Sequence, residues 1–361
     1  MKEITIDRQT EGIKLIRFLG KLFPAASSSF LYKMLRKKNI TLNDKKCIGS
    51  ETLKEEDIIK IYFSDETYSK FAVSTETGSE PYHKEEDTGP AGSPEMSDYD
   101  IYKNIIFEDE DIILVNKPAG ILSQKASAQD NSMVDIITRY LTETKAYAPS
   151  PGNVFRPAVT NRLDRNTSGI VAAGKSVKGL KYLSEGFKNR RFEKFYMCPV
   201  DGIIDRDTLY NGLWSKDSHG NKVRIKDVGA SDRGGRTFPR EYFKPGNIPV
   251  QTAAAPLKDN GRATLLKVEL LTGKSHQIRA QLATAGHPLI GDHKYGVRSV
   301  NDHYKRKYGL EYQLLHAFSL KLPEYGIFYA EIPGQMEKVL IKEGLWLPGI
   351  QEVFGDRHLK I

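Results

Sequence analysis

The hydrophobic residues at the beginning of the chain follow helical and strand spacings in turn. Apolar residues recur three and four positions apart in two segments, and two short apolar runs follow them. Pro24 ends the first of these segments, and Ser27 to Ser29 offer an N-cap to the second. The pattern predicts helices over 13–22 and 30–38 and strands over 39–42 and 58–63. We therefore expect residues 1–64 to form a small α/β module.

Residues 65–100 have no apolar period and are rich in Glu, Ser, Pro and Gly, which predicts a flexible linker. Strand and helix patterns return over 101–345, and residues 346–361 are interpreted as a C-terminal tail. The main segment predicts strands at 105–107, 112–115, 170–173, 192–198, 264–270, 315–320 and 328–333, with helices near 134–141, 177–187 and 275–285. This succession predicts an α+β fold, with a mainly antiparallel mixed sheet and flanking helices. Residues 201–262 are polar and glycine-rich, and Arg233 to Arg236 favour an exposed hairpin over an RNA contact.

The richest chemistry lies in the nine residues from Asn161 to Gly169, directly before a predicted strand. Asp164 is expected on a loop at the mouth of the sheet. Arg162 and Arg165 flank it, and neighbouring cations favour the ionised carboxylate. For an isolated Arg-Leu-Asp-Arg string, a surface loop with a local ion pair would be the simpler interpretation.

The whole string resembles the catalytic motif of the RluA-type pseudouridine synthases, His-Arg-Leu-Asp followed by Thr-Ser-Gly, with Asn161 in place of the histidine. Three further stretches resemble motifs of the same family. Lys194-Phe195-Tyr196 is similar to its Lys-x-Tyr. Residues 272–279 are similar to Thr-Gly-Arg-Thr-His-Gln-Ile-Arg, with Lys274-Ser275 replacing Arg-Thr, and residues 286–292 to Gly-His-Pro-x-x-Gly-Asp. The resemblance covers residues 101–345.

The resemblance implies an isomerase that flips a uridine out of RNA, cleaves its glycosidic bond and re-attaches the base through C5. Asp164 would act on the ribose, either by attacking the anomeric carbon or by removing the neighbouring proton. Tyr196 would stack on the base and assist loss of the C5 proton, and Arg279 would hold Asp164 ionised. Arg162 would fill the space left by the base, and Ile278 is a further candidate for substrate contact. No metal or organic cofactor is expected, and His276 and His287 are interpreted as structural because no third ligand accompanies them.

The first module resembles the S-four-type RNA-binding domain, which implies phosphate contacts by Lys33, Arg36 and Lys37 of its second helix. The family resemblance makes large-subunit ribosomal RNA the expected substrate, with transfer RNA as the alternative. An inactive RNA-binding assembly factor and a glycosidase-like hydrolase, which needs a second carboxylate, stay open as other functions.

Composition narrows the setting of the protein. The 361 residues carry a net charge of +8, which suits a polyanionic partner. No apolar run approaches the roughly 20 residues of a membrane span, and Met1 to Ile4 show no secretory leader. Only two cysteines occur, Cys47 and Cys198, which suits a reducing compartment. We expect a monomeric cytoplasmic protein that does not associate with membranes.

Overall fold

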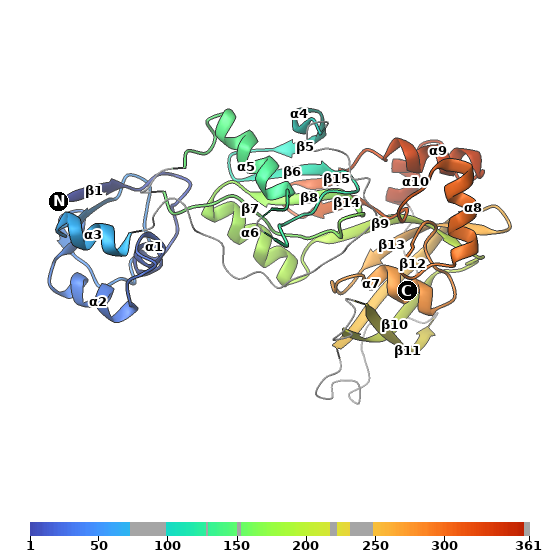
Figure 1. Cartoon of the computed structure of the whole chain (residues 1–361), viewed down its shortest axis with the longest axis horizontal. Coiled ribbons are helices and arrows are strands. Elements are labelled where there is room, and N and C mark those ends of the chain that lie inside the picture. The colour runs from blue at the N-terminus through green and yellow to red at the C-terminus, as the bar shows by residue number, and fades with distance from the viewer. Residues whose placement is uncertain (73–98, 128, 150–152, 217–221, 232–247, 357–361) are drawn as a thin grey trace.

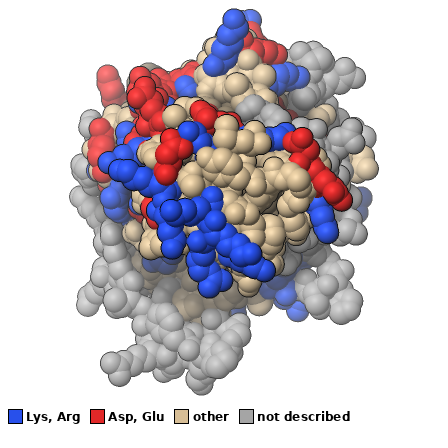
Figure 2. All heavy atoms as spheres, turned by 90° about the vertical axis from the view of Figure 1, so that its left-hand side faces the viewer, with Lys and Arg blue, Asp and Glu red and all other residues tan. Residues whose placement is uncertain are grey.

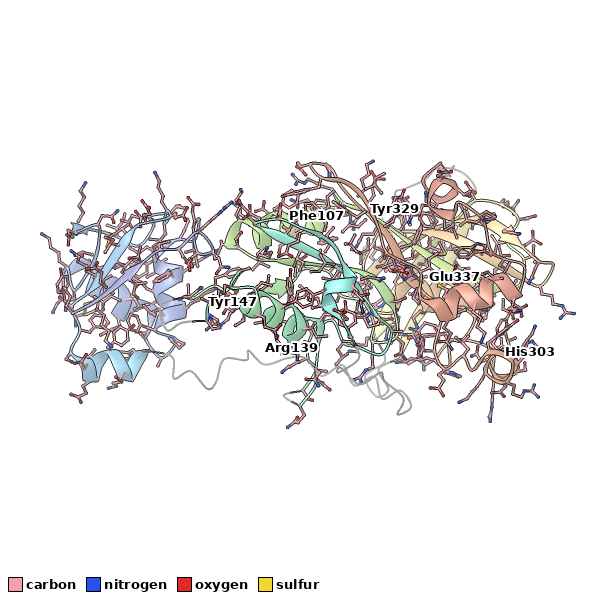
Figure 3. The ribbon with its side chains drawn as sticks, turned by 90° about the horizontal axis from the view of Figure 1, so that it is seen from above. Phe107, Arg139, Tyr147, His303, Tyr329 and Glu337 are labelled. Atoms are coloured by element: carbon pink, nitrogen blue, oxygen red, sulfur yellow. The ribbon has the colours of Figure 1, made fainter. Side chains whose placement is uncertain are left out.

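The structure, a computed structural model, describes residues 1–72, 99–127, 129–149, 153–216, 222–231 and 248–356. A small unit at the N-terminal end and a larger unit follow one another along the long axis of the molecule (Figure 1). Seen from above, Tyr147 lies in the part of the larger unit nearest the small one, and His303 lies toward the opposite end (Figure 3). Among the described residues, no helix is long and apolar enough to cross a membrane.

The N-terminal unit is a four-stranded antiparallel sheet covered by helices. Its sheet has the order β1-β4-β2-β3, so β1 lies at an edge. Ser27 caps the second helix by accepting a hydrogen bond from the Phe30 backbone N–H, as expected from the sequence. The elements are β1 (Lys2–Thr5), α1 (Leu15–Leu22), α2 (Ser28–Arg36), β2 (Ile40–Leu42), β3 (Lys45–Lys46), β4 (Ile58–Ile61) and α3 (Asp65–Phe71).

Helix α3 corrects the expected linker. From the sequence, residues 65–72 were expected in the linker, yet Tyr68 and Phe71 of α3 pack on the hydrophobic core of the N-terminal unit. The Phe23 ring lies 5.2 Å from the Tyr68 ring, and the Phe30 ring lies 4.7 Å from the Phe71 ring. The first unit therefore extends through residue 72. Most of the predicted linker, residues 73–98, lies outside the described residues.

The larger unit confirms the α+β class, with one mixed sheet that is antiparallel except for the pair β8–β14. Its strands follow the order β11-β10-β12-β13-β9-β14-β8-β6-β5, with β15 paired to β14 and β7 paired to β8. The strands are β5 (Ile105–Glu108), β6 (Ile112–Lys117), β7 (Ala158–Val159), β8 (Ser168–Gly174), β9 (Glu193–Asp201), β10 (Thr208–Lys216), β11 (Val223–Ser231), β12 (Ile248–Asp259), β13 (Ala263–Leu270), β14 (His316–Leu322) and β15 (Gly326–Tyr329).

Helices cover both faces of this sheet. Alternate residues of β9 belong to two different cores, because successive side chains of a strand point to opposite faces. Tyr196 and Cys198 lie in the core shared with α5 and α7, and Met197 lies in the core shared with α9 and α10. The helices are α4 (Ile101–Asn104), α5 (Met133–Glu143), α6 (Val177–Lys188), α7 (Gln277–Thr284), α8 (Arg298–Tyr308), α9 (Gly334–Lys342) and α10 (Ile350–Asp356).

Two further stretches differ from the sequence-based expectation. Residues 346–356, expected in a C-terminal tail, include α10 and its fully buried Phe354, so they belong to the core of the larger unit. The polar stretch 201–262 holds the long strands β10, β11 and β12. Arg233 to Arg236 lie outside the described residues.

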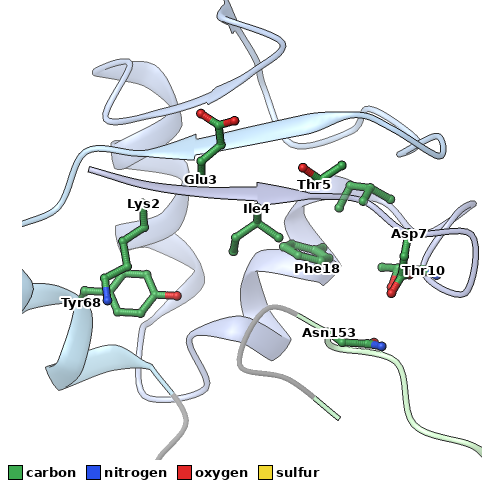
Figure 4. Close-up of a pocket in the computed structure, with 10 residues that line it drawn as sticks. Lys2, Glu3, Ile4, Thr5, Asp7, Thr10, Phe18, Tyr68 and Asn153 are labelled. Carbon is green, nitrogen blue, oxygen red and sulfur yellow. Dashed lines mark hydrogen bonds between the residues drawn. The ribbon is translucent and has the colours of Figure 1, made fainter. Parts of the chain in front are cut away.

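The two units meet at the loop that follows β1. The Gln9 carbonyl accepts a hydrogen bond from the Val177 backbone N–H (2.9 Å), and the Gln9 side chain donates to the Ala146 carbonyl. Arg8 forms an ion pair with Glu110. A pocket lies beside this contact, with Lys2, Thr5 and Tyr68 on one side and Asn153 of the larger unit on the other (Figure 4).

Candidate active site

Asp164 lies on the loop between β7 and β8, where the chain turns into the middle of the large sheet. Its backbone carbonyl accepts a hydrogen bond from the Thr167 N–H at 3.0 Å, which closes the turn. Gly169 follows in the left-handed region, with φ of 113°. A Cβ at Gly169 would lie 2.3 Å from the Ala317 carbonyl oxygen of β14, so only glycine fits there. The Asp164 side chain is 21% exposed, which leaves the carboxylate partly accessible.

Lys117, the last residue of β6, fixes the backbone of this loop by hydrogen bonds. Its fully buried Nζ donates to the carbonyls of Pro118 (2.8 Å), Ile121 (2.7 Å) and Arg165 (2.9 Å). Burial lowers the pKa of Lys117 to about 7, and the charge of the nearby Asp164 carboxylate opposes that shift. The turn formed by Lys117, Pro118, Ala119 and Gly120 therefore holds the backbone next to Asp164.

Arg279 enters the site from the first turn of α7 and is 4% exposed. Its Nη1 donates to Asp164 Oδ2 at 3.0 Å, across 115 residues of sequence. Burial by itself would lower the pKa of Arg279, but hydrogen bonds to Asp292 and the charges of Asp292 and Asp164 outweigh burial and raise it. Arg279 is therefore a permanent cation against the Asp164 carboxylate.

Asp292 holds the other edge of the same guanidinium and was not singled out from the sequence. It is fully buried, and its two oxygens accept from Arg279 Nε (2.7 Å) and Nη2 (3.0 Å). Burial would raise the pKa of Asp292, and the bonds from Arg279 bring it below the ordinary value. Its place in the Gly-His-Pro-x-x-Gly-Asp string was the one sequence signal for it.

His276 also faces Asp164, although it was interpreted as structural. Its Nε2 lies 3.9 Å from Asp164 Oδ2, and its Nδ1 lies 2.9 Å from the Tyr295 hydroxyl oxygen. His276 is the N-cap residue of α7, and its φ of 53° is left-handed. A non-glycine residue in that region is strained, and such strain concentrates at functional sites. His287 lies elsewhere, with Nδ1 3.3 Å from the Asp201 carbonyl oxygen.

Tyr196 and Ile278 line the same face of the sheet. Tyr196 on β9 is 6% exposed and shares a hydrophobic core with Leu163, the residue before Asp164. Burial raises the pKa of Tyr196, and the charge of Asp164 raises it further. Ile278 of α7 is buried in the same core, directly before Arg279. Arg162 is exposed beside this group. The structure thus bonds Arg279 to Asp164 and places Tyr196 in the core that their neighbours Leu163 and Ile278 share. Lys33 and Arg36 of α2 and Lys37 at its C-cap are exposed on the other unit.

Comparisons with known proteins point to one family, the RNA pseudouridine synthases. A protein-family model described as RNA pseudouridylate synthase matches residues 111–284. An uncharacterized RNA pseudouridine synthase of Mycoplasma genitalium is 29% identical over 327 residues, 88% of this chain and 88% of that protein. The ribosomal large subunit pseudouridine synthase C of Vibrio parahaemolyticus is 26% identical over 344 residues, 94% of this chain and 95% of that protein.

A solved structure shares the fold. The human RNA pseudouridylate synthase domain containing 4 is similar over 69% of this chain and 95% of its own, with a TM-score of 0.51 and 18% identity. The family match spans the positions of Asp164, Tyr196 and Arg279. Residues 111–284 form an RNA pseudouridylate synthase domain, and pseudouridine synthases are isomerases.

Proposed function

We propose that this protein converts uridines of large-subunit ribosomal RNA to pseudouridine, with Asp164 as the catalytic carboxylate. The observation that supports this role is the 3.0 Å bond from the buried Arg279 to an Asp164 that is itself still partly exposed. A carboxylate held by a fixed cation and open to a ligand suits chemistry on a ribose. The substrate class follows the printed name of the Vibrio parahaemolyticus relative.

In this proposal the uridine leaves its stack, which costs a few kcal/mol and favours loops and weakly paired sites. Asp164 then acts on the ribose, by attack on the anomeric carbon or by removal of the neighbouring proton, and the glycosidic bond breaks. The detached uracil turns over and bonds through C5, and its C5 proton leaves last. Tyr196 stacks on the base, Ile278 packs beside it, and Arg162 occupies the position that the base vacated.

The N-terminal unit is proposed to be an S-four-type RNA-binding domain. Lys33 and Arg36 of α2 and Lys37 at its C-cap are exposed and would contact phosphates without reading sequence. Figure 2, which views the molecule from the end formed by this unit, shows Lys and Arg side chains gathered on one part of the face. We further propose that the protein acts as a monomer in the cytoplasm.

The arrangement of Asp292 argues against a glycosidase-like hydrolase. That chemistry needs a second carboxylate with access to the sugar. Both oxygens of Asp292 accept hydrogen bonds from Arg279, and the side chain has no exposed surface. Asp292 is therefore unable to serve as an acid or base toward a ligand.

Asp164→Asn tests the proposed site. Pseudouridine formation should be abolished, while the dissociation constant for RNA changes by less than about tenfold, because phosphate contacts rather than this carboxylate carry binding. The measurement is mass spectrometry of digested ribosomal RNA after incubation with each protein. Transfer RNA is assayed in parallel, and turnover on it alone would refute the ribosomal substrate. Substantial turnover by the Asn variant would mean that the wrong carboxylate has been named, and an inactive wild type would favour an assembly factor.

A further inference from the structure

The guanidinium of Arg279 is shared between two carboxylates. Nε and Nη2 form a parallel pair of bonds to Asp292, at 2.7 and 3.0 Å, and Nη1 donates to Asp164 at 3.0 Å. A two-bond fork of this kind fixes the plane and the rotation of a guanidinium, which a single bond does not do. The direction in which Nη1 points is therefore set by Asp292.

Asp292 is itself rigidly held. Its Oδ1 accepts the backbone N–H groups of Lys294 (2.9 Å) and Tyr295 (3.1 Å). Asn301 of α8 fastens the loop on both sides, because its Nδ2 donates to the Asp292 carbonyl and its Oδ1 accepts from the Gly291 N–H, each at 2.9 Å. The loop from Gly291 to Tyr295 is thus a preformed mount for one carboxylate.

The same loop reaches the other side chain that faces Asp164. The Tyr295 hydroxyl accepts the Val223 N–H at 3.0 Å and lies 2.9 Å from His276 Nδ1. The Arg279 guanidinium carbon lies 5.3 Å from the centre of the Tyr295 ring, within the range of a cation–π contact. Both neighbours of Asp164 are consequently oriented from residues 292–295.

We propose that Asp292 is a positioning residue of the isomerase, which acts on the reaction only by orienting Arg279 toward Asp164. This inference rests on the proposed catalytic role of Asp164. Asp292 has no exposed surface and both its oxygens are engaged, so it does not touch substrate. A purely structural carboxylate would support folding alone, and kinetics separate the two roles.

Asp292→Asn keeps the size of the side chain but places an amide NH₂ against a guanidinium N–H. One bond of the fork is lost, and the guanidinium turns. We expect kcat to fall about 100-fold, since a displacement of about 1 Å of a catalytic group has effects of that size. KM for RNA should stay within about twofold, because the buried Asp292 side chain makes no contact with RNA. The melting temperature and circular dichroism of the variant establish that it is folded.

A double-mutant cycle distinguishes positioning from a general loss of stability. In an Arg279→Lys background the fork is already absent, so Asp292→Asn should then lower kcat less than threefold. Equal effects of Asp292→Asn in both backgrounds would overturn the proposal.

Asp111→Asn is the matched control, since Asp111 is another buried carboxylate, paired with Lys178 and Ser176 at the opposite end of β6 from Lys117. It should lower stability and leave kcat within about twofold.

Asp164→Asn is measured in the same assay. If Asp164→Asn is inactive while Asp292→Asn has the kcat of wild type, this inference fails alone. If Asp164→Asn is active, the proposed site fails first. Should Asp292→Asn not fold, Asn301→Ser loosens the same loop without removing a charge, and an unchanged kcat there would overturn the proposal.

Discussion

The Tyr196 hydroxyl keeps its proton at neutral pH. Burial raises its pKa, and the negative charge of Asp164 raises it further. A phenolate is therefore not available as a preformed base beside the substrate. The ring offers a stacking surface, and the hydroxyl offers one donor and one acceptor. Tyr196 is suited to guiding the C5 proton away late in the reaction rather than to starting it.

Tyr196→Phe should separate the early and late steps. The ring is retained, so stacking and fold should be nearly unchanged, while only the hydroxyl is lost. We expect the variant to break the glycosidic bond and then stall with a rearranged base that keeps its C5 proton, whereas Asp164→Asn leaves the uridine intact. Rapid quench of an RNA reaction followed by mass spectrometry of the digest distinguishes these products.

Tyr210→Phe serves as the control, because Tyr210 is also 6% exposed in the same core. The charge of Asp164 is not among the causes of the raised pKa of Tyr210. It should give the wild-type product. Wild-type turnover by Tyr196→Phe would reduce Tyr196 to a stacking surface. A complete lack of bond cleavage would place its hydroxyl in the first step.

At the level of residues, the sequence indicated the groups that sit within recognisable strings but not the contacts among them. Asp164 and Arg279 are 115 positions apart, and no local pattern states that they bond. His276 was judged by the absence of metal partners, yet its place beside Asp164 comes from a left-handed turn at the start of α7. Asp292 was missed for a similar reason. A buried carboxylate is recognised by its partner, and the partner is supplied by the fold.

Helices and strands were predictable where one face is apolar and the other is polar. That pattern predicted α2, α5 and α6 closely. Helix α8 was missed because it is mostly polar and buries only Asn301 and Tyr304. Strands β10 and β11 were missed because glycine and charged residues interrupt their alternation, and they are stabilised by pairing with neighbours far along the chain.

One strand carries a residue that makes stability depend on pH. His316 at the start of β14 is fully buried, and its Nδ1 lies 2.9 Å from Ser168 Oγ. Burial lowers its pKa to about 4, from 6.5 in an exposed histidine. As the pH falls below 6.5, His316 takes up a proton in the unfolded chain but stays neutral in the folded protein. The contribution of His316 to the free energy of unfolding is therefore largest above pH 6.5 and decreases down to pH 4.

The loss attributable to His316 should reach about 3 kcal/mol across that window, which corresponds to the pKa difference at 1.36 kcal/mol per pH unit. His316→Gln keeps a side chain that can bond Ser168 and does not titrate, so it should flatten the decrease in unfolding free energy between pH 6.5 and 4. Urea unfolding at several pH values measures it. His303→Gln, a change at an exposed histidine on α8, should leave the slope as in wild type. An unaltered slope in His316→Gln would contradict the assignment.

In the whole molecule, the described contact between the two units combines polar and apolar groups. Arg8 and Gln9 contact Glu110, Ala146, Asn153 and Val177, and the side chains of Val154 and Val177 pack on the core of the N-terminal unit. The hydrophobic core of each unit is largely its own. The sequence predicted two units from the breaker-rich stretch between them, but it placed the first boundary too early. Tyr68 and Phe71 of α3 are two aromatic residues without a long pattern around them, and only the core that they cover reveals their role.

Removal of residues 1–72 should therefore leave a soluble, folded larger unit with weaker RNA binding and a flatter salt dependence. A chain that lacks only residues 1–64 should be less soluble, because the apolar face of α3 is then exposed to water. Gel filtration and filter binding over a range of salt concentrations measure both effects. Aggregation of the shorter chain that lacks 1–72 would show that the units share a core.

A full-length variant addresses the charges alone. Replacing Lys33, Arg36 and Lys37 by Gln should reduce the slope of log K against log salt by about 2, if each contacts one phosphate of single-stranded RNA. Replacing Lys305, Arg306 and Lys307, which are exposed on α8 at the far end, provides the matched control. Equal slopes in the two triple variants would contradict a specific role for α2.

The close approach of two strands at Gly169 limits which residue types evolution can place at this position. A single added methyl group would collide with the Ala317 backbone, which no rotamer change relieves. Relief would require β8 and β14 to separate, and that movement would carry the Asp164 loop with it. A mutational scan scored on catalysis alone would rank Gly169 with Asp164, although glycine has no functional group. Invariance at this position among relatives would record a steric limit, and it would be misread if it were taken as evidence of chemistry.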